Sequence, residues 1–157
     1  AGLGVAPGPA LAAILAARFG KLAVQIGQRP LVLVGGLVAG LSGLYRVLFL
    51  TAEVSYLVDF AVPLALSAVS IGLVFPQATS VAVQALPPNR VGVGGATTQA
   101  IRQFGGSLGV AFTIALLGKA TATEDLVAGF NRIWWLVVVG GIATALCALP
   151  LRTGKAN

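Results

Sequence analysis

The feature that most constrains the fold is a series of long apolar stretches separated by short polar connections. The stretches cover about residues 3–19, 31–51, 56–84, 93–117 and 131–150. A helix that crosses the hydrocarbon core of a bilayer needs about 20 mostly apolar residues. Inside a bilayer such a stretch must satisfy its own backbone hydrogen bonds, so each one predicts an α-helix. We therefore expect an all-α polytopic membrane protein with about five transmembrane helices in a single membrane domain, 1–157.

The composition excludes several other classes of protein. Hydrophobic residues make up 57% of the chain and charged residues only 9%, whereas a soluble domain carries roughly 25% charged residues. The net charge is +6, but the cations are scattered singly among apolar runs and form no patch for nucleic acid. The expected partner is therefore the lipid bilayer, and not nucleic acid. With one cysteine, Cys147, and no histidine, neither a Cys/His metal site nor a histidine-activated serine nucleophile is expected, so we predict no enzyme and no bound metal.

The distribution of charge predicts the orientation. One side of the expected helices carries six cations and no acid, and cytoplasmic loops are enriched in Lys and Arg. These cations are Arg18, Lys21, Arg29, Arg90, Arg152 and Lys155. The other side carries Arg46, Lys119 and Arg132 together with Glu53, Glu124 and Asp125. We expect the six-cation side and the C-terminus to be cytoplasmic.

Two stretches carry a family resemblance. The first is the basic connection expected at 20–30, GKLAVQIGQRP, and the second is QAIRQFGGSLG at 99–109. The first resembles the cytoplasmic signature of the major facilitator superfamily, in which Gly20, Gly27 and Arg29 match and Val24 and Gln25 replace an acid and a cation. Such a degenerate copy is typical of the C-terminal half. The second stretch resembles the late spans of the fourteen-span drug:proton antiporter branch.

The resemblance implies a fold and a function. The chain would supply the last five of the six spans in the C-terminal half, and it would be an internal or C-terminal piece of a longer protein, since it has no Met and no signal peptide. In such transporters the substrate binds near the midplane between two halves. The implied function is proton-coupled efflux of drugs or other amphipathic molecules in a bacterial inner membrane, driven by the proton motive force with no cofactor and no ATP site. The implied partners are a small-molecule substrate and the N-terminal half of the same polypeptide. A nutrient or metabolite transporter of the same superfamily and a non-transporting helical scaffold remain open.

Polar residues within the spans are the candidates for a substrate pathway. They are Gln77, Gln99, Arg102, Gln103 and Ser107. Gln99, Gln103 and Ser107 share one helix face because they are spaced at i, i+4 and i+8. Such a stripe either lines a wet cavity or joins helices by hydrogen bonds. Arg102 is either a cavity cation or a side chain that snorkels toward the cytoplasmic end of its helix.

Other residues have candidate roles in proton coupling, gating and packing. Asp59, at the outer start of the third span, is either a proton-coupling carboxylate or an acid favoured by the helix dipole. Arg46 is interpreted as snorkelling to the outer interface. The connection that holds Gly20, Gly27 and Arg29 resembles a cytoplasmic gate. Small residues spaced four apart allow close helix packing; these are Gly36 with Gly40 and Gly105 with Gly109.

Overall fold

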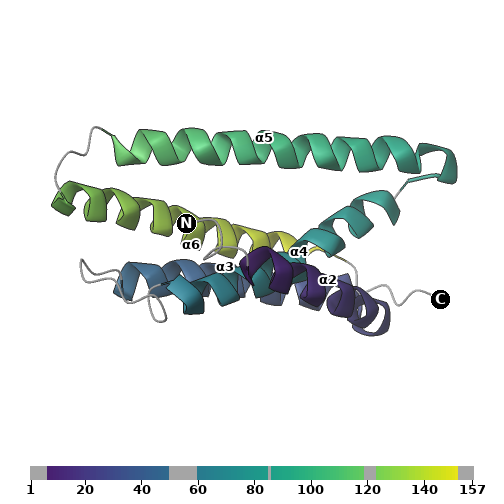
Figure 1. Cartoon of the computed structure of the whole chain (residues 1–157). Helices are drawn as coiled ribbons and strands as arrows, with labels where there is room; N and C mark the ends of the chain where they lie inside the picture. Colours follow the sequence, from purple (N-terminus) through teal and green to yellow (C-terminus); the bar gives the residue numbers. More distant parts are fainter. Residues whose placement is uncertain (1–6, 50–59, 85, 119–122, 152–157) are drawn as a thin grey trace.

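Five long helices form the protein in the computed structural model, which describes residues 7–49, 60–84, 86–118 and 123–151 (Figure 1). They are α2 (Pro7–Ile26), α3 (Gln28–Phe49), α4 (Val62–Gln84), α5 (Val91–Leu117) and α6 (Thr123–Ala148), with a short 3₁₀ helix, η2 (Pro88–Arg90), before α5. All five long helices have the length and apolar character needed to cross a membrane. The prediction of an all-α protein with five membrane-length helices is confirmed.

The connection between the first two helices is much shorter than the sequence predicts. α2 continues through Gly20 to Ile26, and α3 begins at Gln28, so Gly27 alone interrupts the helical structure. Gly27 has a φ of 84°, and its amide donates to the carbonyl of Ala23 at 2.9 Å. This is a helix C-cap in the left-handed conformation, which glycine adopts without steric cost. The predicted loop over 20–30 is therefore wrong: Gly20 lies within α2, and Arg29 lies in the first turn of α3.

Replacing Gly27 with alanine is expected to destabilise the folded protein by about 1–2 kcal/mol, because a Cβ is strained in the left-handed region. Gly20→Ala is the matched control, because Gly20 is helical and a side chain there would meet nothing within 4 Å. Alanine within a helix is more favourable than glycine by roughly 0.5–1 kcal/mol. Thermal unfolding of the full-length protein in detergent, followed by circular dichroism, measures both variants. Equal melting temperatures for the two would contradict the assigned cap.

Of the other helix boundaries, the start of α6 differs from the sequence prediction and the end of α5 agrees with it. α6 begins at Thr123 rather than near residue 131, because the polar residues before the apolar stretch continue the helix. α5 ends at Leu117, where Gly118 adopts a φ of 59°. The predicted start of the third span, at 56, and Asp59 lie outside the described residues.

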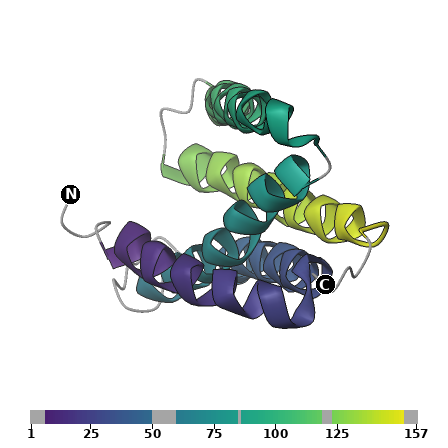
Figure 2. The same cartoon turned by 90° about the vertical axis from the view of Figure 1, so that its right-hand side faces the viewer.

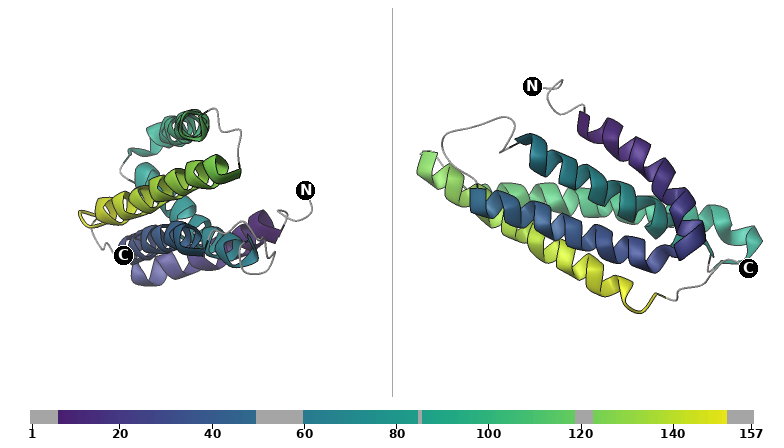
Figure 3. Two further views of the ribbon diagram at one scale, coloured as in Figure 1. Left: turned by 90° about the vertical axis from the view of Figure 1, so that its left-hand side faces the viewer. Right: turned by 90° about the horizontal axis from the view of Figure 1, so that it is seen from below.

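Four of the five helices pack against one another in a curved row. α4 lies between α2 and α3, and α3 lies between α4 and α6 (Figure 3). α5 lies beyond α6, on the side away from α3, and α4 rises from the level of α2 and α3 to meet the start of α5 (Figures 1 and 2). This arrangement leaves α5 as an outlying helix.

Glycines bring α3 and α6 into backbone contact. A Cβ placed on Gly36 would lie 2.6 Å from the backbone nitrogen of Ala145, and one on Gly141 would clash with the backbone of Gly40. Residues without side chains allow two membrane helices to approach this closely. The structure thus places Gly36 and Gly40, the packing candidates of the second span, in the contact between α3 and α6. We call this contact the glycine seam, formed by Gly36, Gly40 and Gly141.

α5 contacts the other helices mainly near its two ends. At its start, Gly94 is buried against Leu86, and at its end Leu117 lies against Gly129 of α6. Gly105 and Gly109 lie in the middle, and a Cβ on either would meet nothing within 4 Å. The structure therefore gives these two packing candidates no helix to pack against among the described residues.

Candidate functional site

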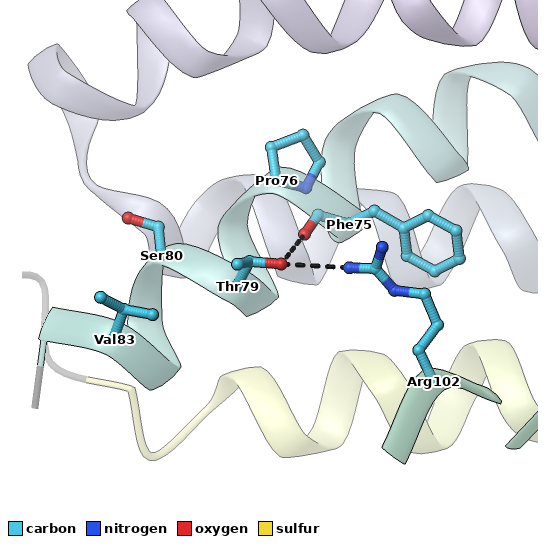
Figure 4. Close-up of a pocket in the computed structure, with 6 residues that line it drawn as sticks. All are labelled: Phe75, Pro76, Thr79, Ser80, Val83 and Arg102. Atoms are coloured by element: carbon cyan, nitrogen blue, oxygen red, sulfur yellow. Dashed lines mark hydrogen bonds between the residues drawn. The ribbon is translucent and has the colours of Figure 1, made fainter. Parts of the chain in front are cut away.

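A wide-open hollow of about 580 Å³ lies between α4 and the middle of α5. Its lining residues are Phe75, Pro76, Thr79, Ser80, Val83 and Arg102 (Figure 4). Five of the six come from α4, where Phe75, Thr79 and Val83 share one face at i, i+4 and i+8. Pro76 lies inside the helix and has no amide hydrogen to donate to the preceding turn. We call this hollow the α4–α5 cavity.

Arg102 is the lining residue that α5 contributes. Its Nη2 donates a hydrogen bond to Thr79 Oγ1 at 3.1 Å, and its Cζ lies 4.8 Å from the centroid of the Phe75 ring. The Thr79 hydroxyl in turn donates to the Phe75 carbonyl at 3.2 Å, as the dashed lines in Figure 4 show. A guanidinium over a ring face is a cation–π contact. Arg102 therefore joins the middle of α5 to α4 through two neutral groups, a hydroxyl and an aromatic ring.

The polar stripe of α5 has no partner on another helix among the described residues. Gln99, Gln103 and Ser107 are all exposed, and Ser107 donates to the carbonyl of Gln103 on its own helix at 3.1 Å. None of the three side chains bonds to another helix within the part of the chain that the structure describes. Interhelical bonding inside this bundle thus does not account for the stripe.

The polar residues of α4 behave differently, because they bond to α3. Ser70 donates to the carbonyl of Gly35 at 2.8 Å, and Ser80 accepts from Gln28 Nε2 at 2.8 Å. Hydrogen bonds of this kind join membrane helices. A polar residue in a span can join helices or line a cavity. Ser70 joins α4 to α3, whereas Ser80 both bonds to α3 and lines the α4–α5 cavity.

Gln77 occupies a different place from the other candidates for the substrate pathway. It is only 2% exposed. It lies seven residues after Ser70 and four after Leu73, on the face of α4 that contacts α3. Its Nε2 is buried and has no hydrogen-bond partner among the described residues. A buried amide without a partner is destabilising. The structure does not bring Gln77 into the lining of the α4–α5 cavity.

Arg46 lies in a cluster that the sequence interpretation missed. Its Nη1 donates to Ser42 Oγ at 2.8 Å and to Ser67 Oγ at 3.3 Å, and its Cζ lies 4.4 Å from the centroid of the Trp134 ring. These contacts join α3, α4 and α6, a role that the interpretation of Arg46 as a snorkelling side chain did not include; the snorkelling itself stays a prediction. The i, i+4 spacing of Ser42 and Arg46 was the available signal, because it places the hydroxyl beside the guanidinium on one helix face.

The sequence interpretation also missed most of the cavity wall. Phe75, Thr79 and Val83 have the same i, i+4, i+8 spacing as the polar stripe of α5, and this spacing could have identified their shared face. A cation within a span needs an acceptor or a ring nearby, and Thr79 and Phe75 supply these for Arg102. Nothing in the spacing indicates that this face of α4 meets α5.

Comparison of the sequence with models of known protein families gave no match, and comparison with curated proteins gave none either. The resemblance to the major facilitator superfamily therefore depends on the motifs at 20–30 and 99–109. Within the described residues, the structure defines the class as a helical protein with five membrane-length helices.

Proposed function

We propose that this chain is the C-terminal part of a secondary transporter of the major facilitator superfamily. In this proposal it belongs to a proton-coupled efflux permease that exports drugs or other amphipathic small molecules by alternating access, without an ATP site. The six-cation side would face the cytoplasm of a bacterial cell. Asp59 stays the candidate for proton coupling.

The observation that carries the proposal is the exposed polar stripe on α5. Gln99, Gln103 and Ser107 share one face of a helix that is long enough to span a bilayer. Transferring an amide into hydrocarbon without a partner costs roughly 4–8 kcal/mol on the cyclohexane scale. Lipid is therefore a poor cover for this face, whereas a wet substrate pathway satisfies it. The N-terminal half of the same polypeptide would supply the opposite wall of that pathway.

The α4–α5 cavity adds a second argument for transport. Arg102 lies on α5 between Gln99 and Gln103, and its side chain reaches Thr79 and Phe75 of α4. Ionisable groups within membrane spans commonly mark pathways for substrates or ions. A scaffold that works only through helix packing has no need for a cation beside an open cavity.

Export by everted membrane vesicles that contain the full-length protein tests the proposal. Gradient-dependent accumulation of a fluorescent amphipathic dye, abolished by a protonophore, is the expected result. Movement in the opposite direction would favour an importer of the same superfamily. Vesicles that move no amphipathic compound under any gradient would overturn the proposal and favour the scaffold.

Gln103→Leu is expected to lower export about tenfold, the effect of losing one hydrogen bond worth ~1.4 kcal/mol. Gln84→Leu is the matched control: Gln84 is also exposed, but its amide bonds to Ser80 at 3.0 Å within α4. Dye export at equal protein levels measures both variants. Unchanged export by Gln103→Leu would remove the polar stripe from the pathway.

A further inference from the structure

We infer that the α4–α5 cavity binds the anionic group of an amphipathic ligand, with Arg102 as the anion-binding residue. This inference deepens the proposed function, on which it rests for its role in transport, by naming a substrate class. That class is a carboxylate attached to an apolar body. Three features of the described structure support it: the unused charge of Arg102, the apolar character of the wall, and the size of the cavity.

The first feature is the unused binding capacity of Arg102. A guanidinium carries five N–H donors, and the structure gives Arg102 one hydrogen bond, to the neutral hydroxyl of Thr79. Its second contact is the ring face of Phe75. Neither group carries a countercharge, and no carboxylate is among the described lining residues. Arg102 is exposed in the described structure, but a cation on a helix that spans a membrane is costly unless it is paired, so an anion is the ligand that best complements this site.

The second feature is the chemistry of the surrounding wall. Phe75, Pro76 and Val83 present apolar surface, while the Ser80 hydroxyl accepts bonds from the amides of Gln28 and Gln84. The wall thus combines one cation that has no countercharge with hydrophobic groups. A carboxylate can accept two parallel hydrogen bonds from an arginine, and the apolar body of the same ligand can lie against the ring and the proline.

The third feature is the volume. At about 580 Å³, the cavity falls within the range of roughly 300–1,000 Å³ that is typical of small-molecule sites. The expected occupant is a medium-length acyl or aromatic carboxylic acid. The competing occupant is a carboxylate from another part of the same polypeptide, which would neutralise Arg102 and leave no preference for anionic ligands.

Binding to the full-length protein in nanodiscs separates these two possibilities. The probe is 11-(dansylamino)undecanoic acid, measured above its pKa, and the reference ligand is its methyl ester, with binding to empty nanodiscs subtracted. The wild-type protein is expected to bind the acid about tenfold more tightly than the ester, as for one charge-assisted hydrogen bond. Arg102→Gln should abolish that preference and leave ester binding unchanged, and Arg102→Lys should retain part of it.

Two controls make the result decisive. Arg90→Gln removes the same charge at the start of α5, outside the cavity lining, and should keep the preference for the acid. Ester binding by Arg102→Gln reports that the variant is folded. Equal affinities for acid and ester in the wild type, or a preference that survives Arg102→Gln, would overturn the inference.

The vesicle assay distinguishes this inference from the proposed function. Export of dyes without any preference for anions would refute the anion site and leave the transport proposal standing. Binding of the acid by Arg102 in a protein that exports nothing would refute transport and leave the anion site standing.

Discussion

A valine at Gly141 is expected to destabilise the folded protein by about 3 kcal/mol, near the upper end of the usual cost of overpacking. The reason is that Gly141 lies in the glycine seam, where its own Cβ would clash with the backbone of Gly40 and lie 2.7 Å from the carbonyl oxygen of Gly36. Flexible side chains can move away from an added group, but the backbones of two packed helices cannot do so without separating. The expected result is separation of α3 from α6.

Gly140→Val is the matched control for the seam. Gly140 precedes Gly141 on α6 and is exposed, and a Cβ added to it would meet nothing within 4 Å. The two variants carry the same substitution in the same helix, so helix propensity cancels between them. Thermal unfolding in detergent and the yield of monodisperse protein measure the difference. Similar stability of the two variants would show that α3 and α6 do not pack through these glycines.

Gln77→Leu is expected to raise the stability of the protein by about 1–2 kcal/mol, although Gln77 is buried in the bundle. Its side chain is 2% exposed, and its Nε2 has no partner among the described residues. Leucine has a similar size and removes the unsatisfied donor, so the change relieves a desolvation cost. Thermal unfolding in detergent tests the expected rise in melting temperature.

The control for this prediction is Gln84→Leu, an exposed glutamine on the same helix, which should melt close to the wild type. A lower melting temperature for Gln77→Leu would show that the amide has a stabilising partner. Export by the same variant gives a second readout. If Gln77 serves the proposed pathway, the more stable protein should export less, as expected when a polar group is kept for function at the expense of stability.

The helices were predictable from the sequence, but one of their connections was not. Apolar length alone specifies five spans, because a bilayer sets the same requirement for every one of them. Gly20 and Gly27 both have the character of turn residues, and only the structure shows that α2 ends at the second. Pro30 was a usable signal: it is tolerated within the first turn of a helix, and α3 does begin two residues before it.

The candidate site was predictable in part, and for a physical reason. Periodicity identifies residues that share a face, so Gln99, Gln103 and Ser107 could be grouped from their spacing. It does not identify what that face meets. From the sequence, a polar residue of α4 such as Ser70 could either line a cavity or bond to α3. The hydrogen bond from Ser70 to the carbonyl of Gly35 shows that this side chain bonds to α3. The partners of Arg102 depend on how α4 and α5 cross, which local sequence does not encode.

The glycine seam has a consequence for the synthesis of the protein. Gly36 and Gly141 lie about a hundred residues apart in the chain, so the ribosome needs roughly 5–20 s to reach α6 after α3 has emerged. During that interval the grooved face of α3 has no partner from α6, and lipid or the insertion machinery must cover it. α6 therefore completes a contact that begins with α3, and a substitution in the seam would first act during biogenesis, before any finished protein exists to be unfolded.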